Sequence, residues 1–375
     1  MLNQLKRTTM SLIATRMLAL RKRNPEFYKN EHRLSEYGAL DFFYTQSLEN
    51  PILTRETKEE VRRSIGRTVQ LPVLNYDGTI QVSNVRTCAV PDAENTSALY
   101  DVTFVTYFIG FTVVPAMYMN NEIDYFEDFD AKIKKAARAL GTALDNAAIA
   151  KLEASKSQVI TDALIYEVTG DAVQVPWASR EDILSDLEPI MSGDDFTGTI
   201  HVVGNQGVNS LLRKLAEKST YNVVDKGIEW MNKRFHFSNR LANEDGKYAT
   251  FYAVEEGNVD MLFRFDREAV RGATGMGHEW YVDIMPYLNI PIGIHFYQSV
   301  GDQSAIAGEA TADLTCALKE YWGFSVDVAF ITSYNSNPAE RANPIIKGEI
   351  ARGNTYAQPV EVVNGETNPV LTQTV

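Results

Sequence analysis

The sequence of 375 residues is poor in the residue types that build cross-links and metal sites. It has two cysteines, Cys88 and Cys316, which are far apart and form no CxxC pair, and its five histidines are scattered along the chain. A disulfide framework or a structural zinc site needs cysteine and histidine residues at short, regular spacings. We therefore predict a fold without disulfides or metal, in which both cysteines are small buried side chains.

The sequence also lacks the motifs on which many enzymes depend. It contains no HExxH, GxSxG, SxxK or GxxxxGK[ST] motif, and no GxGxxG that opens a helix after a strand. The turn at 204–207 lies between an expected strand and an expected helix, but it has no lysine to hold a phosphate and is explained by the start of the helix. We predict that the protein is not an enzyme and binds no cofactor.

Long hydrophobic runs are absent as well. The longest uncharged stretch, 102–117, has 16 residues, is rich in threonine and β-branched residues, and favours a strand over a membrane span. Residues 1–25 contain no acid, which is typical of an organellar transit peptide or of a basic amphipathic helix. Arg16 interrupts their apolar stretch, which argues against a secretory signal, and we favour the helix. The sequence predicts no membrane partner.

Charge is unevenly distributed along the chain, whose formal net charge is −13. Through Gln70 there are 13 basic and 8 acidic residues, whereas the remainder has 23 and 41. Sequence-specific nucleic-acid binding needs a basic face, and the body of the protein offers none. A basic N-terminal arm that contacts phosphate remains possible, and so does an arm that merely packs on protein. The basic residues of this arm are Lys6, Arg7, Arg16, Arg21, Lys22 and Arg23.

The residue patterns predict an α+β chain. Residues 1–66 are mostly helical, and 67–114 are β-rich, with a turn expected at 75–78 between strands at 68–74 and 79–86. Apolar residues then recur every three or four positions from Asp124 to Ser155, which predicts one helix of about 45 Å. Mixed helices and strands follow, and the turn-rich tail after Gly353 has no lysine or arginine.

The order of these segments resembles the major capsid protein of tailed bacteriophages, which has the Hong Kong 97-like fold. Segment 67–114 resembles the extended loop (E-loop) of that family, and 124–155 is similar to its spine helix. The stretch HVVGNQGVNSLL from His201 is similar to the strand, turn and helix that enter the axial domain. The stretches FSVDVAFITSY from Phe324 and NPIIKGEI from Asn343 resemble the final strands.

The resemblance implies a division into an N-terminal arm (1–66), an E-loop (67–114), a peripheral domain (115–175 and 317–352), an axial domain (176–316) and a C-terminal tail (353–375). It implies a structural protein that assembles itself through pentamers and hexamers into an icosahedral head around double-stranded DNA. The family's partners are further copies, a scaffold protein and a portal protein, and its location is the virion, assembled in the host cytoplasm. Intersubunit contacts are expected from the apolar E-loop residues Val69, Leu71, Val73, Ile80, Val82 and Val85.

Two other classes of protein stay open. One is a different assembly protein, such as an encapsulin-like shell or a tail-tube subunit. The other is a cytosolic enzyme that uses the glycine-rich loop Gly272–Gly277 with His278 and Glu279 as an acid–base pair. A surface loop explains the same glycines without any chemistry.

Overall fold

The chain forms two compact units, built from segments that alternate along the sequence. Unit 1 comprises residues 1–34, 104–144 and 262–329, and unit 2 comprises 35–103, 145–261 and 330–375. The computed structural model describes residues 16–19, 22, 36–63, 68–75, 96–118, 122–218, 228–230, 233–275, 277–300, 318–335 and 337–353, and the pairs 355–356, 362–363, 366–367 and 373–374.

The sheet of unit 1 is organised around its longest strand, β14 (Leu318–Thr332). Strand β14 pairs antiparallel with β13 (Pro291–Val300) and, through its residues 320–328, with β3 (Val105–Val113). The other strands of this sheet are β10 (Val259–Arg264), β11 (Thr274–Gly275) and β12 (His278–Ile284). The short helix η2 (Pro115–Tyr118) follows β3 in sequence, and α8 (Arg267–Arg271) lies between β10 and β11. The sheet therefore joins strands that are about 200 residues apart, and β14 holds them together.

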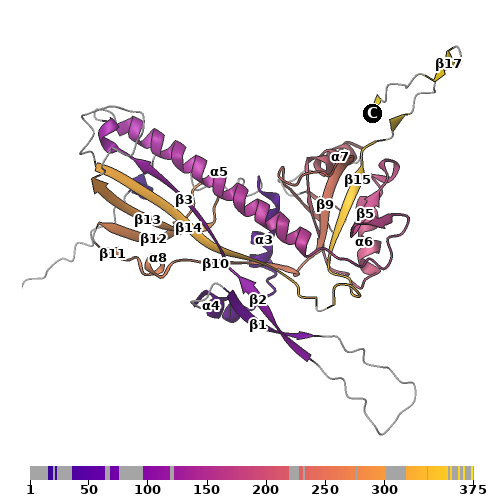
Figure 1. The fold of residues 1–375 in the computed structure, drawn as a ribbon, viewed down its shortest axis with the longest axis horizontal. Coiled ribbons are helices and arrows are strands. Elements are labelled where there is room, and N and C mark those ends of the chain that lie inside the picture. The colour runs from indigo at the N-terminus through magenta and orange to yellow at the C-terminus, as the bar shows by residue number, and fades with distance from the viewer. Residues whose placement is uncertain are drawn as a thin grey trace, which may run out of the picture. The chain divides into compact units, whose positions relative to one another are not determined.

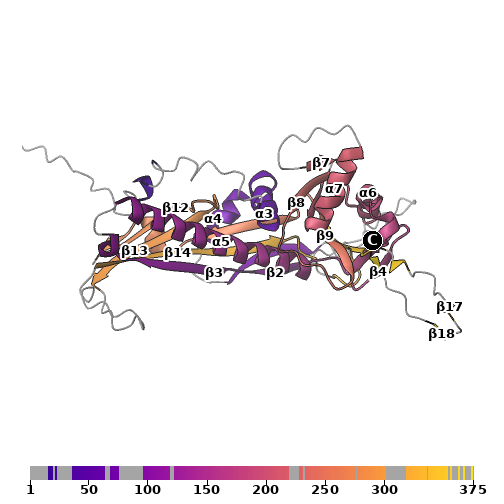
Figure 2. The same ribbon diagram turned by 90° about the horizontal axis from the view of Figure 1, so that it is seen from above.

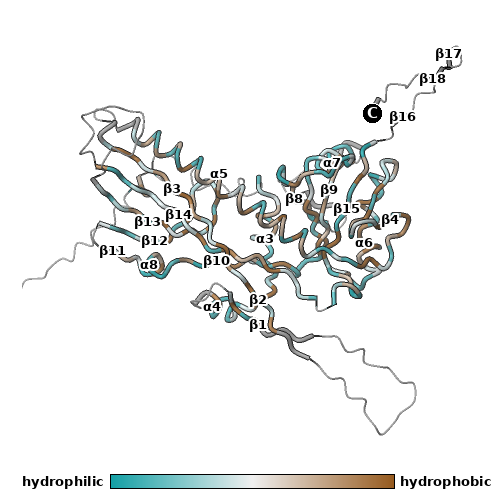
Figure 3. The backbone as a smooth tube through the Cα atoms, in the orientation of Figure 1, coloured by the Kyte–Doolittle hydropathy of each residue, from teal (hydrophilic) through white to brown (hydrophobic). Residues whose placement is uncertain are grey.

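Helix α5 (Glu122–Ala154) confirms the helix predicted from apolar spacing. It lies along β3, β13 and β14 in both views (Figure 1, Figure 2). Its colours alternate between hydrophilic and hydrophobic along its length (Figure 3). The Phe129 ring centroid lies 4.8 Å from that of Trp322 and 5.7 Å from that of Phe111. Burial of this aromatic cluster drives the helix onto the sheet.

Unit 2 contains a seven-stranded mixed sheet whose order is β4, β5, β15, β9, β6, β8, β7. The strands are β4 (Glu167–Thr169), β5 (Ala172–Val175), β15 (Ile345–Ala351), β9 (Lys247–Glu255), β6 (Ile200–Gly204), β8 (Lys233–Phe237) and β7 (Ile228–Trp230). Helices α6 (Ile183–Ser192) and α7 (Gln206–Lys218) contribute buried apolar residues to one core with this sheet. The 3-10 helix η3 (Trp177–Ser179) precedes α6, and the short strands β16 (Thr355–Tyr356), β17 (Val362–Val363), β18 (Glu366–Thr367) and β19 (Gln373–Thr374) lie in the tail.

The turn before α7 has the structural role expected of it. The Asn205 side chain accepts a hydrogen bond from the backbone N–H of Gly207 at 3.0 Å. A Cβ atom on Gly207 would come within 2.5 Å of the Tyr248 carbonyl oxygen, so only glycine lets the helix start this close to β9. Helix entry thus explains this turn without a bound phosphate.

Helix α3 (Gly38–Glu49) is part of the core of unit 2, although the sequence analysis assigns residues 1–66 to one arm. The buried carboxylate of Asp145 accepts hydrogen bonds from the N–H groups of Ala39 and Leu40, both at 3.0 Å, and from the Ser238 hydroxyl at 2.5 Å. The N-cap residue of α3, Tyr37, makes no capping hydrogen bond with its side chain. Asp145 therefore takes the place of the N-cap and fixes α3 on the unit.

Helix α4 (Arg55–Arg63) follows, with the predicted cap at Thr54, whose hydroxyl accepts the Thr57 N–H at 3.3 Å.

The β-rich segment differs from its predicted layout. Strand β1 (Thr68–Asn75) pairs antiparallel with β2 (Thr96–Thr103) from Thr68 and Thr103 to Asn75 and Thr96. The predicted partner strand 79–86 lies outside the described residues. Strand β3, expected in the same excursion, belongs instead to the sheet of unit 1. The ladder includes all eight residues of β1, and the predicted turn lies beyond Asn75, outside the described residues.

The expected axial domain, 176–316, also differs from the observed units. Strands β12 and β13 lie within its limits, but β13 pairs with β14 along residues 293–300, and both strands therefore belong to unit 1. Backbone hydrogen bonds between strands distant in sequence decide this grouping, and no local pattern reports them.

Asp145→Ala should lower the free energy of unfolding by about 2–4 kcal/mol, because it leaves two buried amides and a hydroxyl without their acceptor. Urea unfolding followed by circular dichroism measures this. Glu127→Ala, an exposed acid on the same helix, is the matched control. Equal stabilities of the two variants would contradict the role of Asp145.

Candidate functional site

Three of the six predicted contact residues, Val69, Leu71 and Val73, lie in β1 of the ribbon formed by β1 and β2. Leu71 and Val102 are buried, and Val69 lies opposite Val102 in the register. Val73 lies in β1, but its side chain is outside the described residues, as are Ile80, Val82 and Val85 altogether. The structure thus places the base of the ribbon and leaves the contacts of its far part a prediction.

Strand β2 attaches the ribbon to unit 2. The ring centroid of Tyr100 lies 5.5 Å from that of Tyr334, and Lys151 Nζ donates to the Tyr100 hydroxyl at 3.3 Å. Leu99, the preceding residue, is 62% exposed. The ribbon therefore has a fixed base and at least one large apolar side chain in solvent.

Two of the six basic arm residues are described. Arg16 Nη2 lies 3.4 Å from Oε1 of Glu320, and the guanidinium lies 4.8 Å from the centre of the Tyr125 ring. Met17 beside it is buried, whereas Lys22 is exposed. Lys6, Arg7, Arg21 and Arg23 are outside the described residues. Arg16 is thus held inside its own unit, and phosphate contact by the arm stays a prediction.

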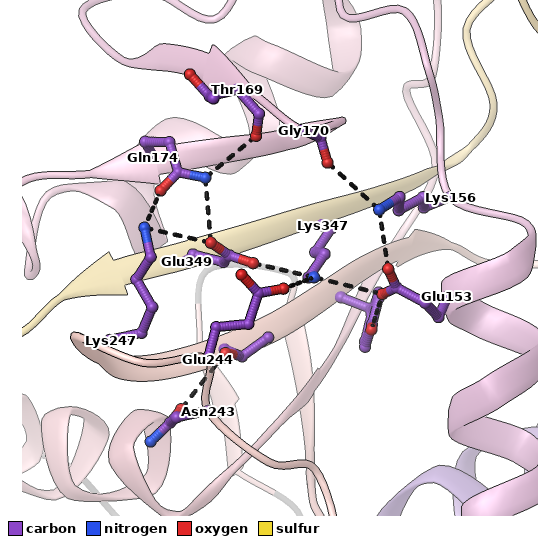
Figure 4. Close-up of polar contacts among 12 residues, drawn as sticks. Glu153, Lys156, Thr169, Gly170, Gln174, Asn243, Glu244, Lys247, Lys347 and Glu349 are labelled. Atoms are coloured by element: carbon purple, nitrogen blue, oxygen red, sulfur yellow. Dashed lines mark hydrogen bonds and ion pairs between the residues drawn. The ribbon is translucent and has the colours of Figure 1, made fainter.

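The face of the unit 2 sheet opposite α6 and α7 carries an ion network that the sequence analysis did not predict (Figure 4). Lys347 on β15 is at its centre, with its side chain only 6% exposed. Its Nζ lies 2.9 Å from Glu349, 2.9 Å from Glu244 and 3.5 Å from Glu153. Alternation along β15 places Lys347 and Glu349 on the same face, where burial makes them depend on each other.

Further contacts satisfy the other oxygens of these acids. Gln174 Nε2 donates to Glu349 at 3.1 Å, and Lys247 lies 3.3 Å from the same carboxylate. The Tyr252 hydroxyl donates a hydrogen bond to Glu153, and Lys156 Nζ donates to the same carboxylate at 2.8 Å. The network joins the end of α5 to β5, β9 and β15 within unit 2.

The network controls the pKa values of its members. Burial disfavours the charged form of Glu349, but the hydrogen bonds from Lys347 and Gln174 outweigh it and lower the pKa of that carboxyl. Burial likewise opposes charge on Lys347, yet its hydrogen bonds to Glu244 and Glu349 raise its pKa above the usual value for lysine. Both groups are therefore ionised at neutral pH.

A second polar chain joins α3 to the same sheet. Gln46 Nε2 donates to His201 Nε2 at 3.0 Å, because an amide nitrogen can only donate. His201 must then carry its proton on Nδ1, which lies 3.2 Å from His236 Nε2, and His236 Nδ1 lies 3.3 Å from the Asp41 carboxylate. Burial lowers the pKa of His201 to about 3, with a further contribution from His236. The neutral ring is thus a fixed part of the α3 attachment.

The acid–base pair proposed for an enzyme is not assembled. His278 and Glu279 are consecutive residues of β12, so their side chains project to opposite faces of the sheet. His278 Nδ1 lies 3.0 Å from Nε2 of His295, and the two rings are stacked. Gly272 ends α8 in the left-handed conformation, with φ of 62°, and so has a structural role.

Two further searches concern only the part of the chain that the structure describes. There, no three or more histidine, cysteine, aspartate or glutamate side chains are grouped as metal ligands. None of the helices in that part has both the length and the apolar character to cross a bilayer.

We expect Lys347→Met to destabilise the protein by about 3–5 kcal/mol, because it leaves the buried Glu349 carboxylate without its partner. The double variant Lys347→Met/Glu349→Leu should regain most of that loss, because apolar groups can replace a buried ion pair. Denaturant unfolding measures both. A single variant as stable as the double variant would contradict the mutual dependence.

The lowered pKa of His201 predicts a pH dependence of stability. The unfolded chain binds a proton near the ordinary value of 6.5, whereas the folded chain does so only near 3. The contribution of His201 to stability should therefore be fully present above pH 6.5 and be lost as the pH falls. Through this group, the unfolding equilibrium constant should increase about tenfold for each pH unit below 6.5. His201→Gln should remove this share of the slope between pH 6 and 5. An unchanged slope would show that His201 does not contribute.

Comparisons with known proteins come from structure alone, since no family model and no curated protein sequence matches the chain. A structure from Mycobacterium phage Che8 is 14% identical and covers 79% of this chain and 89% of that chain, with a TM-score of 0.45. The cyanophage Pam1 capsid asymmetric unit is 11% identical over 78% and 87%, with a TM-score of 0.44. The capsid structure of cyanophage P-SCSP1u is 11% identical over 77% and 84%, with a TM-score of 0.41. The chain is therefore similar to phage capsid structures, at TM-scores below 0.5, and we base its function on its own elements.

Proposed function

We propose that this chain is a major capsid protein of a tailed phage, with the Hong Kong 97-like fold. Copies of it associate through pentamers and hexamers into an icosahedral shell around double-stranded DNA. A scaffold protein and a portal protein are its further partners, and the shell assembles in the host cytoplasm and becomes part of the virion.

The ribbon of β1 and β2 is the observation that carries this proposal. An isolated two-stranded ribbon is marginally stable in water, and this one is anchored by Leu71 and Val102 at its base. Leu99 remains exposed on β2, and the sequence beyond β1 continues with the apolar residues Ile80, Val82 and Val85. An adjacent copy of the chain supplies the second apolar face that this ribbon needs.

The order of elements supports the same function. The ribbon precedes β3 and α5, the seven-stranded unit follows, and β14 and β15 return late in the sequence. In the proposed shell, α5 is the spine helix of the peripheral domain, and α6, α7, β6 and β9 belong to the axial domain. The late strands β14 and β15 pair with the earlier strands β3 and β9, and these pairings hold the parts of the chain together.

The charge of the chain suits a container for DNA. A net charge of −13 discourages tight adhesion of the phosphate backbone to the wall. DNA is then enclosed by the shell and is not bound by sequence, which leaves it free to pack and to leave.

Negative-stain electron microscopy of the purified chain, with and without a scaffold protein, tests the proposal. Closed shells, tubes or rings of five and six are the expected result. A small globular oligomer under all conditions would overturn it. Particles that enclose a protein cargo and no DNA would indicate an encapsulin-like shell instead.

Leu99→Asp should reduce assembly and leave the single subunit folded, because this side chain is 62% exposed and has little to lose within the subunit. Leu48→Asp at the end of α3, where Leu48 is 67% exposed, is the matched control. Sizing measures the assembled fraction, and thermal unfolding measures the subunit. Equal assembly of both variants would contradict a ribbon contact through Leu99.

A further inference from the structure

An exposed apolar surface at the edge of unit 2 lies in a part of the chain that is rich in acids. Leu164, Ile165 and Val168 are 46%, 74% and 38% exposed and lie in or next to β4, the edge strand of the seven-stranded sheet. We name this surface the acidic knob. Its acids are Asp162, Glu167, Asp182, Asp186, Asp194 and Asp195.

The knob is held in a defined conformation. Leu164 has φ of 56°, in the left-handed region that residues with a side chain rarely adopt. The Asp162 carboxylate accepts the Leu164 N–H at 2.8 Å, and the Ala163 carbonyl accepts the Tyr166 N–H at 3.0 Å. The Tyr166 hydroxyl donates to Asp186 at 2.7 Å. These bonds hold the strained turn with its apolar side chains in solvent.

Contacts with residues 161–166 place several of these acids at the strained turn. Asp194 accepts the Thr161 N–H at 3.2 Å. The negative charges of Asp182 and Asp186 both oppose ionisation of the Tyr166 hydroxyl. Burial first, and then Asp186, raises the pKa of the Tyr166 hydroxyl above its usual value. None of the six carboxylates forms an ion pair with a lysine or arginine among the described residues. Residues 160–199 contain nine acids and one base, a net charge of −8.

The N-terminal segment of the chain has the complementary chemistry. Residues 1–15 carry Lys6 and Arg7 and no acid, and the next acid follows only after Pro25. Their apolar residues are Leu2, Leu5, Met10, Leu12 and Ile13. A basic apolar segment matches an apolar surface surrounded by carboxylates, since desolvation and charge attraction then favour the same contact.

The segment precedes a residue of unit 1, whereas the acidic knob belongs to unit 2. Arg16, the residue that follows this segment in the sequence, is held by Glu320 and Tyr125 in its own unit. Fully extended, 15 residues span at most about 50 Å. We propose that residues 1–15 of one copy dock on the acidic knob of the next copy, an inference that rests on the proposed assembly.

Disulfide trapping in assembled particles tests this contact directly. Ile165→Cys and Leu5→Cys, placed together in the full chain, should give covalent dimers and longer ladders under mild oxidation. Each single variant is the control, and a mixture of the two single variants should give dimers only. Particles that form normally but yield no more cross-links than the single variants would overturn the docking and leave the proposed function intact.

Charge exchange provides an independent test. Glu167→Lys/Asp182→Lys should raise the protein concentration for half-maximal assembly about tenfold, through like-charge repulsion with the basic segment. Adding Lys6→Glu/Arg7→Glu should restore most of the loss. Glu127→Lys/Asp245→Lys changes the net charge equally at exposed sites outside the knob and is the matched control. No rescue, or an equal effect of the control, would overturn the proposal.

A binding measurement does not require assembly. A fluorescent peptide of residues 1–15 should bind the wild-type full chain, with affinity falling as salt rises, and should bind Glu167→Lys/Asp182→Lys at least fivefold more weakly. Equal binding to both would overturn the docking. Lys6→Glu/Arg7→Glu, placed in the peptide and in the full chain, separates protein contact from DNA contact. If these substitutions reduced only the DNA in the particles and left peptide binding and cross-linking unchanged, the segment would bind DNA, and the docking proposal would be overturned.

Discussion

The buried side of helix α5 is the constraint on which both units depend. In unit 1, Phe129 packs among the aromatic residues of the sheet around β14, so the helix closes that core. In unit 2, Asp145 caps α3, and Glu153 enters the ion network of β15. A helix of 33 residues can supply all three contacts because the residues on its buried side recur every three to four positions. A change in its phase would disturb every one of them.

The two faces of the seven-stranded sheet are stabilised by different physics. One face packs apolar side chains against α6 and α7, where burial of area provides the free energy. The other face carries Lys347, Glu349 and the chain through His201, where each charge or ring depends on a specific partner. Such polar contacts add little net stability but penalise any other arrangement, so they specify how α3 and the end of α5 attach.

The surfaces that are left exposed differ from both cores. The ribbon offers Leu99, and the acidic knob offers Leu164 and Ile165 on a turn whose backbone strain is maintained by hydrogen bonds. A single subunit gains nothing from keeping these apolar groups in water. In the proposed shell another copy would cover them, and the cost in the free subunit would become a driving force for association.

The sequence by itself determined the elements with local causes. Apolar periodicity predicted α5, and Thr54 marked the start of α4. Tertiary structure decided which strands pair, because β1 meets β2 and β13 meets β14 through backbone bonds that side-chain patterns do not encode. It also decided that Asp145 and Lys347 are buried, since a charged residue looks the same in sequence whether its partner is water or a distant carboxylate.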